Sequence, residues 1–227
     1  MQHQSTRSHA RMMREIIAET AETTAWTGIA ALSARTVAAL GRVRREAFVP
    51  QSERGAAYVN APLPIGHGQT ISQPFIVALM TELAAPGPHD IVLEVGTGSG
   101  YQAAVLAELA ARVYSIEVVP ALAARAEQTL RAEGYHNIVV RVGDGAEGWP
   151  EHAPFDAIVV TAAAPEVPPA LVAQLKPGGR MVIPVGMPAG EQRLLVVTRD
   201  AAGGVSRRDV LGVAFVPLVA PGGVRHG

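Results

Sequence analysis

The stretch Asp90-Ile-Val-Leu-Glu-Val-Gly-Thr-Gly-Ser-Gly-Tyr101 decides the fold of this chain. An apolar run ends in a turn that holds Gly96, Gly98 and Gly100, and a helix-forming run follows directly. This order predicts a strand, a glycine turn and a helix start, as in nucleotide-binding α/β sheets. Glycine can adopt positive φ and lets a ligand approach the backbone, and the helix beyond offers free N–H groups.

The three glycines follow the spacing G-x-G-x-G rather than the G-x-G-x-x-G of dinucleotide-binding enzymes. The third glycine comes one residue too early for the NAD motif, so the spacing favours S-adenosylmethionine (SAM) and leaves an NAD dehydrogenase as a distant alternative. We expect the turn to bind this cofactor through Gly96, Thr97, Gly98, Ser99 and Gly100.

Composition places the chain among ordinary globular proteins. Its 227 residues, of which 48% are apolar, suffice for one α/β domain with a substantial core. The formal net charge is −1 and no basic patch is visible, so nucleic acid is not an expected partner. The absence of cysteine excludes disulfides, thiolate zinc sites and cysteine nucleophiles, and it suits a reducing cytoplasm.

The beginning of the chain gives no sign of export. Residues 1–24 mix basic and acidic side chains and contain no apolar core of signal-peptide length. No run in the chain approaches the length of a membrane span. We therefore expect a cytoplasmic protein without a membrane partner.

Apolar runs alternate with helix-forming segments from residue 91 onward. Strands are predicted over residues 91–95, 112–117, 137–142, 155–161 and 180–185, and helices over residues 100–111, 119–133 and 168–175. This alternation predicts a doubly wound, mostly parallel sheet with helices on both faces, the Rossmann-like α/β class of SAM-dependent methyltransferases. The runs at residues 194–198 and 210–219 have no long helix between them, so we expect them to pair antiparallel.

The segment before residue 91 is expected to be helical at first and then irregular. Residues 9–25 predict an exposed amphipathic helix, and Ser33 is placed to cap a second helix that reaches Leu40, with Gly41 just past its end. We expect residues 1–42 to form an N-terminal helical extension and residues 43–227 to form the methyltransferase domain. Residues 50–66 and 66–74 are predicted to be loops, and Pro74 suits the first turn of a helix over residues 74–84.

Three acidic residues lie in or just after predicted strands. Glu117 ends the second strand, where it can accept hydrogen bonds from the ribose hydroxyls of an adenosine; a solvent-exposed strand end is the alternative. Asp144 and Gly145 follow the third strand, where Asp144 either faces an adenine amino group or simply stabilises a turn. Glu94 lies inside an apolar strand, and we expect it to hold the N–H groups of the glycine loop or to reach the ligand through water.

Other polar residues give weaker signals from the sequence alone. The nucleophile elbow G-x-S-x-G is absent, so a hydrolase triad is not expected, and Ser72 by itself would be interpreted as a helix N-cap residue. His67 lies between two glycines and indicates no fixed role. His136 and His152 have no acidic neighbours at ligand spacing, so no metal site is predicted.

Several further pieces carry a close resemblance to one family. They are Arg45-Glu-Ala-Phe-Val-Pro50, Pro62-Leu-Pro-Ile-Gly-His-Gly-Gln-Thr-Ile-Ser-Gln-Pro74, Leu93-Glu-Val-Gly-Thr-Gly-Ser-Gly-Tyr-Gln102, Val113-Tyr-Ser-Ile-Glu117, Gly143-Asp-Gly-Ala-Glu-Gly-Trp149, Ala153-Pro-Phe-Asp-Ala-Ile158 and Leu175-Lys-Pro-Gly-Gly179. Through them the chain resembles the protein-L-isoaspartate (D-aspartate) O-methyltransferase family over roughly residues 43–218. The pieces that contain Gly68-Gln-Thr-Ile-Ser72, Gly143-Asp-Gly145 and Ala153-Pro-Phe-Asp-Ala-Ile158 are highly specific. The glycine turn, in contrast, is shared with many SAM enzymes.

The resemblance implies repair of damaged proteins. Members transfer a methyl group from SAM, which becomes S-adenosylhomocysteine, to the α-carboxylate of an L-isoaspartyl residue, with D-aspartyl residues as a further expectation. The ester then collapses to a succinimide, part of which reopens as normal aspartate. The partners are accordingly damaged proteins and peptides, and we expect the chain to act as a monomer.

The resemblance also assigns residues. It implies that Ser72 is the active-site residue and that Ile71 and Gln73 lie beside the methyl donor. The glycine turn, Glu117 and Asp144-Gly145 match cofactor positions. We expect His67 and Thr70 to bind substrate together with Ser72.

This chain departs from the family pattern in residues 1–42 and at Val43-Arg44, and neither departure is expected to touch the site.

The chemistry asks little of the protein beyond alignment. An aspartyl α-carboxylate is already ionised at neutral pH, so neither a strong base nor a metal is needed. A neutral hydroxyl such as that of Ser72 can orient the carboxylate without quenching it. Two alternatives stay open: a SAM-dependent methyltransferase for another acceptor, and a SAM-binding module without turnover.

Overall fold

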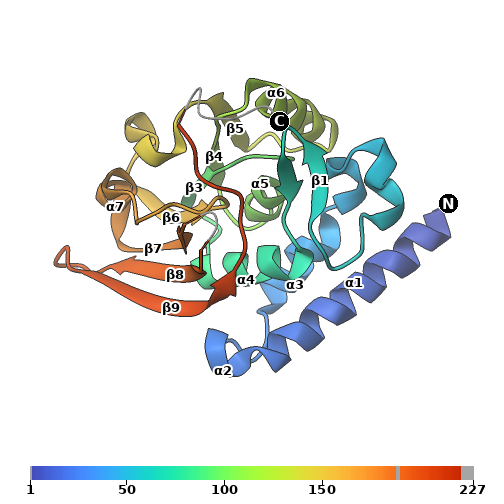
Figure 1. The fold of residues 1–227 in the computed structure, drawn as a ribbon, viewed down its shortest axis with the longest axis horizontal. Helices are drawn as coiled ribbons and strands as arrows, with labels where there is room; N and C mark the ends of the chain where they lie inside the picture. The colour runs from blue at the N-terminus through green and yellow to red at the C-terminus, as the bar shows by residue number, and fades with distance from the viewer. Residues whose placement is uncertain (1, 188–189, 221–227) are drawn as a thin grey trace.

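The computed structural model describes residues 2–187 and 190–220, and within them a seven-stranded sheet forms the centre of the molecule (Figure 1). Its order is β5-β4-β3-β6-β7-β8-β9. The first five strands in that order run parallel, whereas β8 is antiparallel to both of its neighbours. The strands are β3 (Ile91–Val95), β4 (Arg112–Glu117), β5 (Ile138–Val142), β6 (Phe155–Val160), β7 (Leu175–Gly186), β8 (Gln192–Arg199) and β9 (Val205–Val213). The expected fold class is confirmed.

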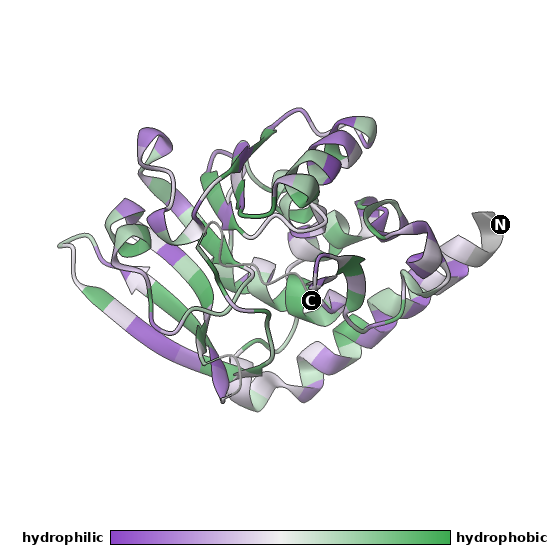
Figure 2. Ribbon diagram, turned by 45° about the horizontal axis from the view of Figure 1, so that its top comes forward, coloured by the Kyte–Doolittle hydropathy of each residue, from purple (hydrophilic) through white to green (hydrophobic). Residues whose placement is uncertain are grey.

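The central strands are apolar throughout because both faces of the sheet are covered. Two apolar clusters lie on the two faces of the sheet. Val92 and Val159 belong to one cluster, and their neighbours Leu93 and Val160 belong to the other. Successive side chains of a strand point to opposite faces, so a strand buried on both sides reads as a continuous apolar run. Figure 2 shows this apolar centre and a hydrophilic stretch along the outer strand β9.

Helices cover the sheet close to the predicted positions. They are α1 (Gln2–Glu22), α2 (Thr24–Thr27), α3 (Ala34–Arg42), α4 (Pro74–Ala84), α5 (Tyr101–Ala107), α6 (Pro120–Ala132) and α7 (Pro169–Gln174). α5 is shorter than predicted, because the chain after Glu108 turns so that the N–H groups of Ala111 and Arg112 reach the carbonyl of Asp90. No helix within the described ranges is both long and apolar enough to cross a membrane.

The N-terminal helices pack onto the same core as the sheet. α1 is longer than expected and buries Met12 and Ile16 completely in the cluster that also holds residues of α3 and α4. Ser33 caps α3 by accepting a hydrogen bond from the N–H of Thr36 at 3.2 Å, as predicted. The prediction for Gly41 was wrong: it lies inside α3, which ends at Arg42.

The segment before α4 contains more regular structure than the predicted loops. Residues 51–56 form a short 3₁₀ helix, and β1 (Leu63–Gly66) pairs with β2 (Gln69–Ile71) as an antiparallel hairpin. His67 at its tip adopts a φ of +55°, between two glycines that also have positive φ. α4 begins at Pro74 as predicted, but its N-cap is Gln73, so the interpretation of Ser72 as the cap residue was wrong.

Candidate functional site

A cleft of about 550 Å³ lies where the carboxyl ends of β3, β4 and β6 meet. It is lined by the glycine turn, the ends of these strands, Gly145 and residues 216–219. Ligands of open parallel sheets bind at this edge. The cleft therefore lies where the sequence predicted a nucleotide.

The glycine turn is held by the neighbouring strands. Gly96, Gly98 and Gly100 all have positive φ. The N–H groups of Gly96 and Thr97 donate to the carbonyl of Ile116 in β4, at 2.8 and 3.2 Å. A side chain at position 96 is sterically excluded, since its Cβ would lie 2.4 Å from the Thr161 hydroxyl oxygen. The turn is thus a fixed cradle of backbone in the cleft wall.

Glu117 holds the turn from the end of β4. One carboxylate oxygen accepts the N–H of Gly98 at 2.7 Å and the other accepts the N–H of Val119 at 3.0 Å. The side chain is buried and lines the cleft, so the alternative of a solvent-exposed strand end was wrong. Each oxygen keeps further acceptor capacity, which a pair of ribose hydroxyls can use.

Asp144 and Gly145 lie next to each other but differ in what they contact. The Asp144 carboxylate accepts the N–H of Ala146 at 2.9 Å and begins a 3₁₀ turn. Asp144 therefore stabilises a turn, which was one of the two alternatives that the sequence allowed. It also lines an apolar cavity beside the cleft, together with Pro165 and Leu218. Gly145 lines the cleft itself, and a Cβ there would lie 2.3 Å from a methyl group of Val95.

Glu94 supports the turn through hydroxyl groups rather than through the expected N–H groups. Its carboxyl group accepts a hydrogen bond from Ser115, whose hydroxyl lies 2.5 Å from that of Thr97. The N–H groups of the turn bond Ile116 and Glu117 instead, so the expected contact of Glu94 with these N–H groups was wrong, whereas its contact with the ligand through water stays a prediction. Burial raises the pKa of Glu94 from 4.5 to about 8; the Ser115 hydrogen bond opposes this rise and the charge of Glu117 adds to it.

A second, larger cleft of about 1320 Å³ adjoins the first. Thr70, Thr161 and Val216 line both clefts, and Ser72 lines the second. A small hollow with Ile71 and Ser72 on one side and the glycine turn on the other also lies at this junction. The structure therefore brings the Thr70–Ser72 segment and the cofactor turn together, although they are distant in sequence.

The N-terminal extension reaches this second cleft. Glu19 of α1 lines it and accepts hydrogen bonds from Gln73 at 3.2 Å and from Asn60 at 2.7 Å. The side-chain oxygen of Asn60 in turn accepts the N–H of Phe75 at the start of α4. The expectation that residues 1–42 would not touch the site was wrong, because Glu19 and Thr23 line the second cleft.

His67 lies apart from the other predicted substrate residues. It is exposed at the tip of the β1–β2 hairpin and lines neither cleft nor the hollow. Its carbonyl accepts a hydrogen bond from the Gln69 side chain at 3.4 Å. The hairpin therefore contributes to the junction through β2 and the residues that follow it, rather than through its tip.

Thr161 is a site residue that the sequence analysis missed. It follows β6, and its hydroxyl donates to the carbonyls of Val95 and Gly96 at 3.1 and 2.7 Å. It lines both clefts and the hollow between them. A hydroxyl residue directly after a buried strand was the available signal, but nothing local connects it with the glycine turn.

The chain after β9 forms a cover over the first cleft rather than the predicted continuous strand to residue 219. β9 ends at Val213, and residues 214–220 then cross beside Ala163. Ala163 donates to the carbonyl of Val216 and accepts from the N–H of Leu218, both at 2.8 Å. The buried Gln192 side chain also bonds both backbone groups of Phe215. These contacts hold the cover in place and make Val216 a wall between the clefts.

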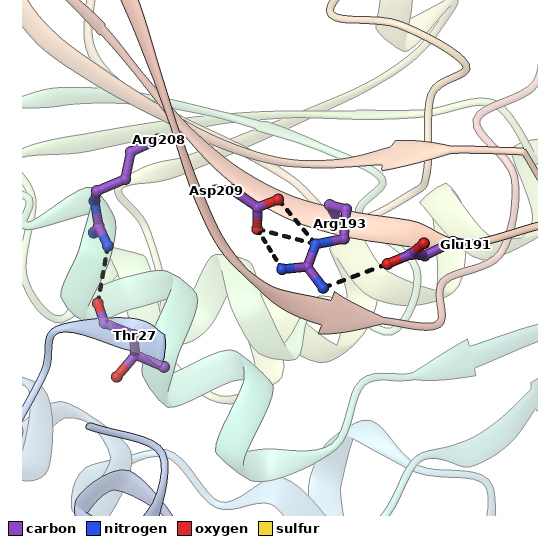
Figure 3. A network of polar contacts seen from close by, with 5 residues as sticks. All are labelled: Thr27, Glu191, Arg193, Arg208 and Asp209. Atoms are coloured by element: carbon purple, nitrogen blue, oxygen red, sulfur yellow. Dashed lines mark hydrogen bonds and ion pairs between the residues drawn. The ribbon is translucent and has the colours of Figure 1, made fainter. Parts of the chain in front are cut away.

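Polar contacts of strands β8 and β9 join separate elements (Figure 3). Arg193 of β8 binds Asp209 of β9 at 2.8 Å and Glu191 at 3.5 Å. Arg208 donates to the carbonyl of Thr27 in α2 at 3.0 Å. The bond from Arg208 thereby connects strand β9 with the N-terminal helix α2. Within the described ranges, no group of three or more His, Asp or Glu residues is placed to hold a metal ion.

The raised pKa of Glu94 predicts a pH-dependent gain in stability for Glu94→Gln. Between pH 4.5 and about 8 the folded protein holds a proton that the unfolded chain releases, so the free energy of unfolding falls as pH rises through this window. The variant does not titrate there. Urea unfolding should therefore show an advantage of the variant over the wild type that is larger at pH 8 than at pH 5, by roughly 1–3 kcal/mol.

Glu151→Gln serves as the matched control, since the Glu151 side chain is 70% exposed. Its difference from the wild type should change little between the two pH values. An equal Glu94→Gln effect at pH 5 and pH 8 would contradict the raised pKa.

Comparisons with known proteins agree with this geometry. Residues 23–222 match the family described as protein-L-isoaspartate(D-aspartate) O-methyltransferase. The chain is 58% identical to protein-L-isoaspartate O-methyltransferase 2 of Polaromonas sp., over 91% of this chain and 98% of that protein. It is 56% identical to protein-L-isoaspartate O-methyltransferase 2 of Syntrophobacter fumaroxidans, over 93% of this chain and 85% of that protein.

Solved structures have the same fold. One described as a protein-L-isoaspartate O-methyltransferase superposes with a TM-score of 0.81 at 26% identity, over 94% of this chain and 66% of that chain. A candidate protein-L-isoaspartate O-methyltransferase of Plasmodium falciparum, solved with S-adenosyl-L-homocysteine, gives a TM-score of 0.73 at 24% identity, over 82% of this chain and 91% of that chain. The extent of these matches and the arrangement of the two clefts lead to one conclusion: this chain belongs to the protein-L-isoaspartate(D-aspartate) O-methyltransferase family.

Proposed function

We propose that this protein methylates the α-carboxylate of L-isoaspartyl residues in damaged proteins, with SAM as the methyl donor, and thereby starts their repair. One observation carries the assignment of roles: Ser72 lies at the junction of two clefts, one built around the glycine turn and one open to solvent. Family membership supports the reaction, and the two clefts provide separate places for donor and acceptor.

The first cleft fits SAM through its backbone cradle and its acids. Positions 96 and 145 have no room for side chains, so the backbone itself forms the wall, as binding of a nucleoside requires. When bound, SAM supplies an electrophilic methyl group on a cationic sulfur. Glu117 would hold the ribose, and Asp144 and Gly145 the adenine end. Ile71 and Gln73 would lie beside the reacting end, and residues 216–219 would cover the ligand.

The second cleft would take the isoaspartyl segment. Ser72 would donate a hydrogen bond to the substrate α-carboxylate, and Thr70 would line the path toward the donor. The carboxylate has an ordinary pKa near 3.3–3.7, so it is a nucleophile at neutral pH without help from a base. The protein contributes alignment and exclusion of water, and alignment alone can supply about 7–11 kcal/mol of the barrier.

We also propose that the protein acts as a monomer in the cytoplasm. The chain has no cysteine, which suits a reducing compartment. Light scattering at assay concentration should return a mass near 23.7 kDa. A mass twice as large would contradict the monomer.

Activity is tested most simply with a pair of synthetic peptides that differ only in their aspartyl linkage. With labelled SAM, the isoaspartyl peptide should accept methyl groups, whereas its normal aspartyl twin should not, because its side-chain carboxylate cannot reach the donor with the same backbone position. A D-aspartyl peptide forms a third arm. Equal labelling of the first two peptides would favour another acceptor, and SAM binding without any labelling would favour a binding module.

Two substitutions should separate the acceptor side from the donor side. Ser72→Ala should lower kcat roughly tenfold to hundredfold with little change in SAM affinity, since it removes one donor to the reacting carboxylate. Glu117→Ala should weaken SAM binding about tenfold or more, because it removes charged hydrogen bonds to the ligand. Calorimetry and steady-state kinetics measure both effects.

Ser206→Ala is the matched control, since Ser206 pairs with Thr198 on the exposed β8–β9 surface. It should leave both quantities unchanged. An unchanged kcat for Ser72→Ala, or unchanged SAM affinity for Glu117→Ala, would overturn the role assigned to that residue.

A further inference from the structure

Arg45 is a fully buried cation without an acidic partner. It has no exposed surface and belongs to the largest fully buried side chains of the molecule. No carboxylate forms an ion pair with it in the part of the chain that the structure describes. Burial lowers the pKa of Arg45 to about 10, so the guanidinium remains charged at neutral pH.

A buried charge of this kind is costly, and stability alone does not account for it. The Nη1 atom of Arg45 has no partner at hydrogen-bond geometry within the described residues, and the neighbouring Tyr101 side chain offsets only part of the cost of burying the charge. Even a buried ion pair can often be replaced by apolar residues of similar volume at no cost in stability, and Arg45 has no partner of opposite charge. We therefore look for the role of this guanidinium in the hydrogen bonds that its other N–H groups donate.

These N–H groups hold two distant points of the backbone. Nε donates to the carbonyl of Ala57 at 2.9 Å, and Nη2 donates to the carbonyl of Ser72 at 2.7 Å. Ala57 precedes the β1–β2 hairpin and Ser72 follows it, so one planar side chain ties together both ends of the hairpin. Among the described contacts, the bond from Arg45 is the one polar contact of the Ser72 carbonyl.

The same guanidinium also faces the cofactor side. Its central carbon lies 4.8 Å from the ring centroid of Tyr101, which is buried and begins α5 directly after Gly100. A cation over an aromatic face is attracted to it, and the attraction is stronger in a dry interior. Tyr101 and Ser72 both line the hollow beside the glycine turn. Arg45 thus contacts the helix start beyond the turn and the backbone of the predicted catalytic serine at once.

We propose that Arg45 is a positioning residue for methyl transfer. Its guanidinium fixes the Ser72 backbone relative to the start of α5, and thereby sets the place of the Ser72 hydroxyl with respect to the methyl donor. The inference rests on the proposed role of Ser72. It predicts an effect on turnover rather than on binding, because a small displacement of a reacting group costs rate even where the ligands still bind.

Arg45→Lys is the informative change. A single ammonium keeps the charge but lacks the planar fork that reaches two carbonyls at once. Arg45→Gln is the second variant. It removes the buried charge, so we expect it to fold even if the ammonium group of the lysine variant is displaced and prevents folding. Arg199→Lys is the matched control, because Arg199 of strand β8 also donates to two backbone carbonyls, those of Ala173 and Leu175.

A double-mutant cycle distinguishes positioning from a general structural role. Turnover of the isoaspartyl peptide is measured for the wild type, Arg45→Lys, Ser72→Ala and the double variant, with S-adenosylhomocysteine affinity by calorimetry as the measure of folded protein. Arg45→Lys should lower kcat about tenfold in the wild-type background but less than about twofold in the Ser72→Ala background. Product affinity and the peptide KM should stay within about twofold. Arg199→Lys should change none of them.

Each other outcome overturns a defined part of the account. The same loss of kcat in both backgrounds, or no loss in the wild-type background, would overturn the positioning role of Arg45. A loss that follows a drop in product affinity would do the same, since it would report a general structural effect. If Ser72→Ala alone left turnover unchanged, the role of Ser72 would fail, and this inference with it. Arg45→Gln enters the same cycle where Arg45→Lys does not fold.

Discussion

The site depends on the close contact between the ends of β3 and β6, where Gly96 and Thr161 leave no room for another side chain. The Thr161 hydroxyl bonds the carbonyls of Val95 and Gly96, and the Gly96 N–H bonds back to β4. These contacts fix the turn between three strands. A glycine with positive φ is required there by geometry, and the remaining site residues take their positions from this turn.

Around the turn, the chain builds two clefts with a shared wall. Thr70, Thr161 and Val216 separate a covered cleft from an open one. This division suits a transfer between a small bound donor and a protein acceptor, because one partner must be enclosed and the other must arrive from solvent. The open cleft also draws on α1, through Glu19, so the N-terminal extension belongs to the same structural unit as the site.

Much of the fold could be predicted from the sequence because its signals are local. Apolar runs marked β3, β4, β5 and β6 within a residue, whereas β7 begins at Leu175, five residues before its predicted start; Pro74 marked the start of α4, and Ser33 marked the cap of α3. Glu117 was also predictable, since the carboxyl ends of neighbouring parallel strands meet at one edge. The β1–β2 hairpin was missed because its strands are only a few residues long and its turn is rich in glycine.

The contacts that complete the site could not be predicted in the same way. Thr161, Glu19 and Arg45 act through partners that are distant in sequence, and none follows from a local pattern. The cover formed by residues 214–220 depends on Gln192 and Ala163, so its apolar sequence alone suggested a strand. Resemblance to a family indicated Ser72 as the active residue, whereas the three-dimensional contacts indicate what holds it in place.

A crystal structure of this protein with S-adenosylhomocysteine tests the central claim most directly. The account predicts the ribose at the Glu117 carboxylate, the adenine end beside Gly145, and the sulfur at the hollow shared by the glycine turn and Ser72. The product bound elsewhere, or a Ser72 hydroxyl directed away from the sulfur, would contradict it.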